Sequence, residues 1–259
     1  MNRIYQFLRH WLTSNTRHGV HSPFVYNLID QCIYRDSNST RPVFEYYEGL
    51  KANKLQLEGV DYGRNGNVVK RSVSDMIKSS GSQDFEAALL NRLVSFHQSR
   101  SVLELGTNLG KSAASMAIHN KESRIHGVEG NEALVGFSNK CFQELGLTNV
   151  YCECRTFQDY FDKNDLPYDF IFIDGDHNYA STLENYQASK KCLTGVGPIV
   201  LHDIYWSSGM QKAWKEITQD AEATVTIDLF FFGLVYFRPQ QTKQHFNVRF
   251  PKSLFRSLF

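Results

Sequence analysis

The sequence has no apolar run long enough to cross a bilayer. Its most apolar stretch, Leu229 to Phe237, is nine residues long and is bounded by Asp228 and Arg238, whereas a spanning helix needs about 20 apolar residues. The first residues lack the continuous apolar core and the cleavage pattern of a signal peptide. We therefore expect no stable membrane insertion.

Cysteine and net charge are also scarce. The five cysteines stand at irregular spacings, and no two pairs have the spacing of metal ligands. We expect them to be reduced, which is typical of a cytoplasmic protein. The formal net charge is only +1, without a Lys/Arg stripe, so we expect no nucleic-acid partner. A composition of 42% hydrophobic and 21% charged residues is that of an ordinary globular domain.

The most informative stretch that is present is SVLELGTNLGKS, residues 101–112. Its apolar run carries Glu104 near its end, and a turn with Gly106 and Gly110 follows. Small, helix-compatible residues come next. This pattern predicts a buried strand, a tight loop and a helix whose N-terminus faces a ligand. The two glycines would let the backbone turn sharply and let the ligand lie close to it.

The loop does not have the spacing of the common phosphate-binding loops. The dinucleotide fingerprint needs a second glycine where this chain has Asn108. The phosphate loop G-x-x-x-x-G-K-[ST] needs its first glycine at position 105, which is leucine. Glu104 would also repel bound phosphates at short range. An acid at this strand end suits a cationic ligand instead.

A second acid ends the next predicted strand, residues 124–129. Nucleotide-like ligands on such sheets recruit a carboxylate about 20 residues beyond the loop to bind the ribose hydroxyls, and Glu129 fits this place. A carboxylate can accept hydrogen bonds from both hydroxyls at once. The alternative is that Glu129 only caps the helix that starts near Asn131.

Strand-like and helix-like segments alternate from residue 100 onward, as in parallel βαβ units. We predict strands near residues 101–106, 124–129, 149–154, 168–174, 197–202, 223–230 and 233–238. We predict helices near residues 84–98, 111–120, 132–145, 157–163, 179–193 and 209–220. The last two strands are so close in the sequence, around Gly233, that they must be antiparallel.

The predicted fold is α/β, a Rossmann-like doubly wound sheet of seven strands with a terminal antiparallel pair, plus a mainly helical N-terminal extension. The corresponding divisions are residues 1–83 (extension or lid), 84–240 (main domain) and 241–259 (C-terminal tail). In the extension, Ser22 should cap a helix that begins at Pro23, and the glycine-rich stretch 59–66 should be a loop. We expect residues 1–80 to cover the crevice at the strand ends.

The first helix of the extension is predicted to be amphipathic, with one apolar face that docks on the protein itself. This predicted docking face consists of Ile4, Phe7, Leu8, Trp11 and Leu12.

Polar residues follow two neighbouring strands in the second half of the chain. The first strand delivers Asp174, Asp176 and His177 to its C-terminal end, and the next delivers His202 and Asp203. Ligands of α/β sheets bind at this edge. Two carboxylates from adjacent strand ends could hold Mg²⁺ or Ca²⁺. Such an ion would lower the pKa of a bound hydroxyl, and an imidazole could take the proton.

Three motifs together resemble a known family. They are E-x-G-x-x-x-G at residues 104–110, F-I-D-G-D-H-x-Y at 172–179 and G-P-I-V-x-x-D at 197–203. They resemble class I S-adenosylmethionine-dependent methyltransferases, and among these the small-molecule O-methyltransferases of the catechol and macrolide-sugar types. The resemblance implies S-adenosylmethionine as cofactor, a small-molecule hydroxyl as methyl acceptor, and Mg²⁺ as a possible second cofactor.

The resemblance also assigns roles to residues. His177 and Asp203 take the catalytic positions, and Asp174 and Asp203 take those of the metal ligands. The implied cofactor-binding residues are Glu104, Gly106, Thr107, Asn108, Gly110, Ser112, Glu129 and Asp174.

The chain departs from the family pattern at two places. Ile204 stands where metal-dependent members carry another oxygen ligand, and Arg155-Thr156 stands where many carry an acid near the adenine. Metal dependence therefore stays open, as do the acceptor and its methylated atom. A nicotinamide-dependent oxidoreductase is one alternative, disfavoured by Asn108 and by the terminal antiparallel pair. A non-catalytic interaction protein with the same fold is the other.

Overall fold

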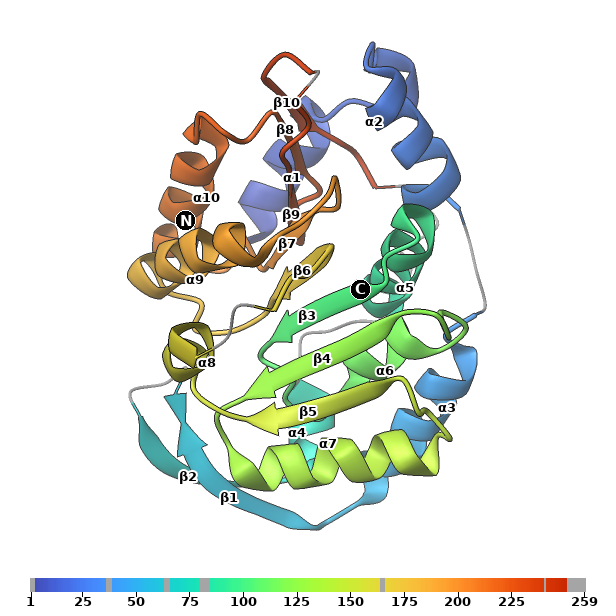
Figure 1. Cartoon of the computed structure of the whole chain (residues 1–259), viewed down its shortest axis with the longest axis vertical. Coiled ribbons are helices and arrows are strands. Elements are labelled where there is room, and N and C mark those ends of the chain that lie inside the picture. Colours follow the sequence, from blue (N-terminus) through green and yellow to red (C-terminus); the bar gives the residue numbers. More distant parts are fainter. Residues whose placement is uncertain are drawn as a thin grey trace. The chain divides into compact units, whose positions relative to one another are not determined.

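The computed structural model describes residues 3–35, 39–62, 66–79, 84–163, 166–239 and 241–250. The chain forms two compact units. One, here the histidine unit, comprises residues 1–36, 169–173 and 177–259, and the other, here the loop unit, comprises residues 37–168 and 174–176. Figure 1 labels the helices and strands of both.

The loop unit contains the predicted glycine turn, three parallel strands and a separate hairpin. Its helices are α3 (Arg41–Gly49), η3 (Leu50–Ala52), α4 (Val73–Ser79), α5 (Asp84–His97), α6 (Lys111–Ala117), α7 (Glu132–Glu144) and α8 (Phe157–Lys163). Its strands are β1 (Gln56–Asp61), β2 (Asn67–Ser72), β3 (Ser101–Leu105), β4 (Arg124–Glu129) and β5 (Val150–Cys154).

The parallel strands β3, β4 and β5 form the core of the loop unit. Strand β4 pairs with β3 on one side and β5 on the other, with Leu105 opposite Val128 and Glu129 opposite Cys154. Strands covered on both faces are continuously apolar, and β3 is buried from Val102 to Leu105. Helix α6 is also buried from Ser112 to Ala117, because its small side chains allow close packing. The carboxyl ends of β3 and β4 thus carry the predicted loop and acid.

The stretch 59–66, which we expected to be a loop, lies partly in an antiparallel hairpin. Strand β1 pairs with β2 from Gln56 opposite Ser72 to Asp61 opposite Asn67, and Figure 1 shows the hairpin alongside α7. The glycines of this stretch suggested a turn, but Gly59 lies inside β1 against Asn131. A strand glycine often marks such a close approach. Residues 63–65 lie outside the described part.

The histidine unit contains five strands and both the first and the last described helices. Its helices are α1 (Arg3–Thr13), η1 (Arg17–Gly19), α2 (Pro23–Leu28), η2 (Ile29–Ile33), α9 (Tyr179–Cys192) and α10 (Ser208–Gln219). Its strands are β6 (Phe170–Ile173), β7 (Ile199–His202), β8 (Val225–Asp228), β9 (Phe232–Tyr236) and β10 (Gln244–Asn247). As predicted, Ser22 caps α2, its hydroxyl accepting from the N–H of Val25.

The strands of the histidine unit confirm the predicted antiparallel pair and add one strand. Strand β6 is parallel to β7, and β9 is antiparallel to both β7 and β8. All seven predicted strands are present in the two units, and the α/β fold class is confirmed. Strand β10, within the predicted tail, pairs in parallel with β8. The sequence did not indicate β10 because its residues are largely exposed and show no apolar alternation.

The face that helix α1 buries in the histidine unit differs from the docking face that its apolar pattern predicted. Its fully buried residues are Gln6 and His10, while Ile4, Leu8 and Leu12 are 60%, 51% and 71% exposed. The docking face that we predicted is therefore wrong for these three residues. The cause is a buried acid at the end of β8 that selects His10 as its partner, as described below.

None of the helices in the described part of the chain is both long enough and apolar enough to cross a membrane.

Candidate cofactor and active site

Glu104 is a fully buried carboxylate near the end of β3. Its exposed fraction is 0%, and neither carboxylate oxygen has a hydrogen-bond partner in the described structure. Burial raises the pKa of Glu104 to about 8; the hydroxyls of Ser112 and Thr107 oppose the shift, and the charges of Asp174 and Glu129 add to it. A buried acid without partners favours a cation or a hydrogen-bond donor beside it.

The loop after β3 requires glycine at both predicted positions. Gly106 has a φ of +94°, and a Cβ there would lie 2.2 Å from the carbonyl oxygen of Asp174. Gly110 has a φ of +87°, and a Cβ there would lie 2.7 Å from the ring of Phe142. Side chains at these positions would be strained and would clash. The predicted sharp turn of the loop is confirmed.

Glu129 holds the loop through its backbone. One carboxylate oxygen accepts from the N–H of Asn108 and the other from the N–H of Asn131, each at 3.0 Å. The side chain of Asn131, and not that of Glu129, caps α7, accepting from the N–H groups of Ala133 and Leu134. Each carboxylate oxygen can accept a second hydrogen bond, so Glu129 retains the capacity to bind hydroxyls.

A pocket opens over this loop within the loop unit. It is lined by the predicted loop, by Asp174 and by two side chains from the N-terminal extension. The lining residues are Tyr47, Ile77, Gly106, Thr107, Asn108, Leu109, Lys111, Ser112 and Asp174. The pocket thus brings five of the eight predicted cofactor residues together, while Glu104, Gly110 and Glu129 are not among its lining residues.

Tyr47 and Ile77 were not predicted from the sequence. The hydroxyl of Tyr47 donates to the carbonyl oxygen of Leu109 at 2.7 Å, which ties α3 to the loop. Burial raises the pKa of Tyr47 well above its ordinary value, so it stays a donor. Only the aromatic spacing on α3 could have indicated such a role, and it is equally typical of a core residue.

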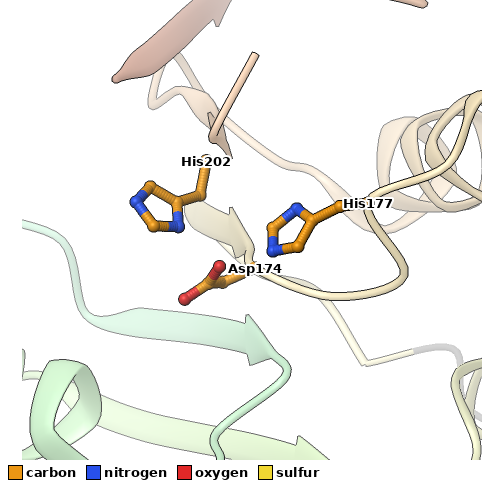
Figure 2. Close-up of side chains that lie close together, drawn as sticks. All are labelled: Asp174, His177 and His202. Carbon is orange, nitrogen blue, oxygen red and sulfur yellow. The ribbon is translucent and has the colours of Figure 1, made fainter. Parts of the chain in front are cut away.

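Two predicted histidines come together in the histidine unit. His202 is the last residue of β7 and is buried, and the ring of His177 lies 6.0 Å from it, centroid to centroid. Figure 2 shows these two rings with the side chain of Asp174, which directly follows β6. One potential ligand atom of each residue lies within 4.8 Å of the other two. Two imidazoles and one carboxylate are typical of a transition-metal site rather than a Mg²⁺ site.

Asp203 is not a member of that group. Its carboxylate pairs with the guanidinium of Arg3 at 2.8 Å, its N–H donates to the carbonyl oxygen of Phe231, and its φ is +51°. Arg3 also lies over the ring of Trp206. The first helix therefore reaches the end of β7, which the sequence did not predict because no pattern in residues 1–13 indicates the partner.

A second buried acid in the histidine unit has a full set of partners. Asp228 accepts from Nε2 of His10, the hydroxyl of Tyr205, the indole N–H of Trp214 and the N–H of Phe230, at 2.8 to 3.1 Å. Burial alone would raise the pKa of Asp228, but the hydrogen bonds and the charge of His10 hold it below its usual value. This cluster anchors α1 to the end of β8.

Comparisons with known proteins agree with this architecture. Residues 103–204 match a family model described as a methyltransferase domain. None of the curated proteins matches the chain.

Three solved structures have a similar fold. A methyltransferase of Podospora anserina, PaMTH1, solved with S-adenosylhomocysteine (SAH), has a TM-score of 0.58 over 83% of this chain and 93% of its own. An O-methyltransferase of Bacillus cereus, also with SAH, has a TM-score of 0.55 over 83% and 96%. The O-methyltransferase TomG of Streptomyces achromogenes, solved with S-adenosylmethionine (SAM), has a TM-score of 0.55 over 82% and 94%.

Each of the three is 13% identical in sequence to this chain, so the likeness is one of fold. The match over residues 103–204 includes the glycine loop, Glu129, the strand before Asp174, and both histidines. Residues 103–204 thus match a methyltransferase domain, and the fold is similar to that of three methyltransferases solved with SAH or SAM.

Proposed function

We propose that the chain binds SAM over the glycine loop and transfers its methyl group to a hydroxyl of a small molecule. The observation that carries the proposal is Glu104, which is buried, lacks hydrogen-bond partners and has a raised pKa. A ligand with a sulfonium and an ammonium group would compensate this carboxylate, whereas a pyrophosphate would be repelled by it. The structural neighbours solved with SAH and SAM support the same donor.

The predicted cofactor residues divide into two roles in this proposal. Gly106 and Gly110 shape the loop, and Thr107, Asn108 and Ser112 line it beside Asp174. Glu129 accepts from the ribose hydroxyls as well as from the two backbone N–H groups, since each carboxylate oxygen can accept more than one hydrogen bond. These roles would hold the ribose of the donor at Glu129 and its sulfonium and ammonium groups near Glu104.

On the acceptor side, we propose His177 as the general base and Asp203 as a positioning residue. His177 is only partly buried, as a group that meets an acceptor must be. The carboxylate of Asp203 is paired with the guanidinium of Arg3, so it is already engaged by the protein. Methyl transfer needs the acceptor oxygen in line with the sulfonium methyl, so positioning supplies much of the rate.

The residues present do not fit the Mg²⁺ site that the resemblance implied. Asp203 is held by Arg3, the Ile204 side chain offers no oxygen, and the potential metal ligands grouped with Asp174 are the imidazoles of His177 and His202. We therefore propose a reaction in which the protein supplies the base and no step depends on Mg²⁺. Turnover should be unchanged by exhaustive treatment with EDTA. A loss that Mg²⁺ restores would return Asp174 and Asp203 to the role of metal ligands.

Calorimetric titration with SAH and with NAD tests the donor. We expect saturable binding of SAH and no heat with NAD. Binding of NAD alone would support the oxidoreductase alternative, and binding of neither would support the interaction protein. A screen of phenolic, catecholic and sugar hydroxyls with radiolabelled SAM then tests the acceptor, with amines as the comparison set for transfer to nitrogen.

A further inference from the structure

The aromatic ring of Tyr62 lies on Gly130, the residue that follows Glu129. A Cβ at position 130 would be 2.5 Å from Cδ2 and 2.8 Å from Cε2 of this ring. The edge of the ring therefore rests on the backbone of the β4–α7 connection, which only glycine allows. Tyr62 nevertheless keeps 51% of its surface exposed. An aromatic residue with about half of its surface exposed thus lies against the residue that follows the one assigned to the ribose.

A second close approach fixes the hairpin in this place. A Cβ on Gly59 of β1 would lie 2.3 Å from the side-chain amide oxygen of Asn131. Asn131 is the cap of α7 and also donates its N–H to Glu129. The hairpin therefore contacts the β4–α7 connection at both residues that directly follow Glu129. The close approach of the hairpin to this connection is possible because Gly59 on one side and Gly130 on the other have no side chain.

We propose that Tyr62 is a cofactor-binding residue whose ring stacks on the adenine of SAM. The inference rests on the proposed function, because it takes Glu129 as the ribose ligand. The base is bonded to the same ribose, so it must lie within one sugar's length of the Glu129 carboxylate. Aromatic side chains bind bases by stacking on their π-faces. Tyr62 lies outside residues 103–204, so the domain match does not assign it.

Substitutions at position 62 separate stacking from simple packing. SAH binding is measured by calorimetry on the full chain. We expect Tyr62→Phe to bind SAH within a factor of about two of the parent, and Tyr62→Ala to bind about tenfold more weakly. Tyr62→Leu keeps an apolar contact with Gly130 but has no flat π-face, so it should also bind weakly. Val68→Ala is the matched control, because Val68 is 65% exposed on the partner strand of the same hairpin.

A double-mutant cycle with Gly130→Ala tests whether the contact on Gly130 places the ring. The added methyl group would displace the Tyr62 ring, so Gly130→Ala should also weaken SAH binding. If the loss comes from the ring, Gly130→Ala combined with Tyr62→Ala should be no weaker than Tyr62→Ala alone. If the two losses add in full, the methyl group acts on the ligand directly, and the proposed contact is overturned.

The outcomes distinguish this inference from the proposed function. If the parent chain does not bind SAH, the proposed function fails. If the parent binds SAH and Tyr62→Ala binds it equally well with an unchanged melting temperature, only the stacking proposal fails. If Tyr62→Leu binds as well as Tyr62→Phe, the ring has only a packing role, which also overturns the proposal.

Discussion

Two buried carboxylates, one in each unit, have opposite environments. Asp228 is 1% exposed and accepts four hydrogen bonds, and its pKa lies below the usual value. Glu104 is 0% exposed, has no hydrogen-bond partner in the described structure, and its pKa is raised to about 8. Both lie near the end of a buried strand.

The difference separates a structural acid from a binding acid. Asp228 is satisfied by the protein, so it stabilises the fold and has little to offer a ligand. Glu104 is buried without a hydrogen-bond partner in the described structure, two residues before the pocket-lining Gly106. An unsatisfied buried acid destabilises the ligand-free protein and favours a cationic ligand. The following predictions test this contrast.

The largest effect should come from breaking the satisfied cluster. Asp228→Ala leaves His10, Tyr205 and Trp214 with buried donors, so we expect a loss of about 3–5 kcal/mol in the free energy of unfolding. Denaturant unfolding measures it. Tyr205→Phe removes one hydrogen bond and should cost about 1 kcal/mol. Equal losses in both variants would contradict the idea of a cooperative cluster.

Removing the ionisable carboxyl group of Glu104 should weaken binding without weakening the fold. We expect Glu104→Gln to weaken SAM binding by about 10- to 100-fold, because a cationic ligand favours the ionised form of Glu104 and glutamine cannot ionise. Its melting temperature near pH 8 should be equal to or above that of the parent. Calorimetry and thermal unfolding measure the two quantities. A variant that binds SAM normally would remove Glu104 from the cofactor site.

The raised pKa of Glu104 predicts how stability depends on pH. The folded state holds a proton on Glu104 up to about pH 8, while the unfolded chain releases it near its ordinary value. The contribution of Glu104 to the free energy of unfolding is therefore fully present below the pKa that this carboxyl group has in the unfolded chain. It is lost as pH rises through the pKa that the group has in the folded protein. Between pH 6 and pH 8 the loss from this group should be about 2 kcal/mol.

Subtracting the free energy of unfolding of Glu104→Gln from that of the parent at each pH isolates the contribution of Glu104, because the other groups titrate equally in both proteins. If the two unfolding free energies change in parallel with pH, Glu104 is ionised in the folded state and the contrast with Asp228 disappears.

The smallest effect should come from the ion pair of Asp203 with Arg3. The Arg3 side chain is 44% exposed, so solvent and salt screen the pair. We expect Arg3→Ala to lower the free energy of unfolding by less than about 1 kcal/mol. The loss should shrink in 0.5 M NaCl, where the Debye length is about 4 Å instead of about 8 Å at physiological ionic strength. A loss near that of Asp228→Ala would mean that Arg3 is an anchor of α1 in its own right.

The local sequence predicted the loop because its requirements are local. The positive φ of Gly106 and Gly110 and the apolar run of β3 can be anticipated from a few adjacent residues. The strand ends that carry Glu104, Glu129 and His202 follow in the same way from apolar runs that stop at polar residues. The hairpin and β10 were missed because their residues are exposed or polar and are defined by backbone pairing.

By itself, the sequence determined the α/β order of elements, the glycine turn and the acids that end the strands. These depend on side-chain period and on backbone preferences, which act over a few residues. Only the tertiary structure decided which of the acids are satisfied. His10 contacts Asp228, and Arg3 contacts Asp203, across more than 190 positions of sequence. A local sequence pattern cannot predict a partner at such a separation. The roles of Glu104 and Asp228 thus differ because burial and hydrogen bonding depend on the whole fold.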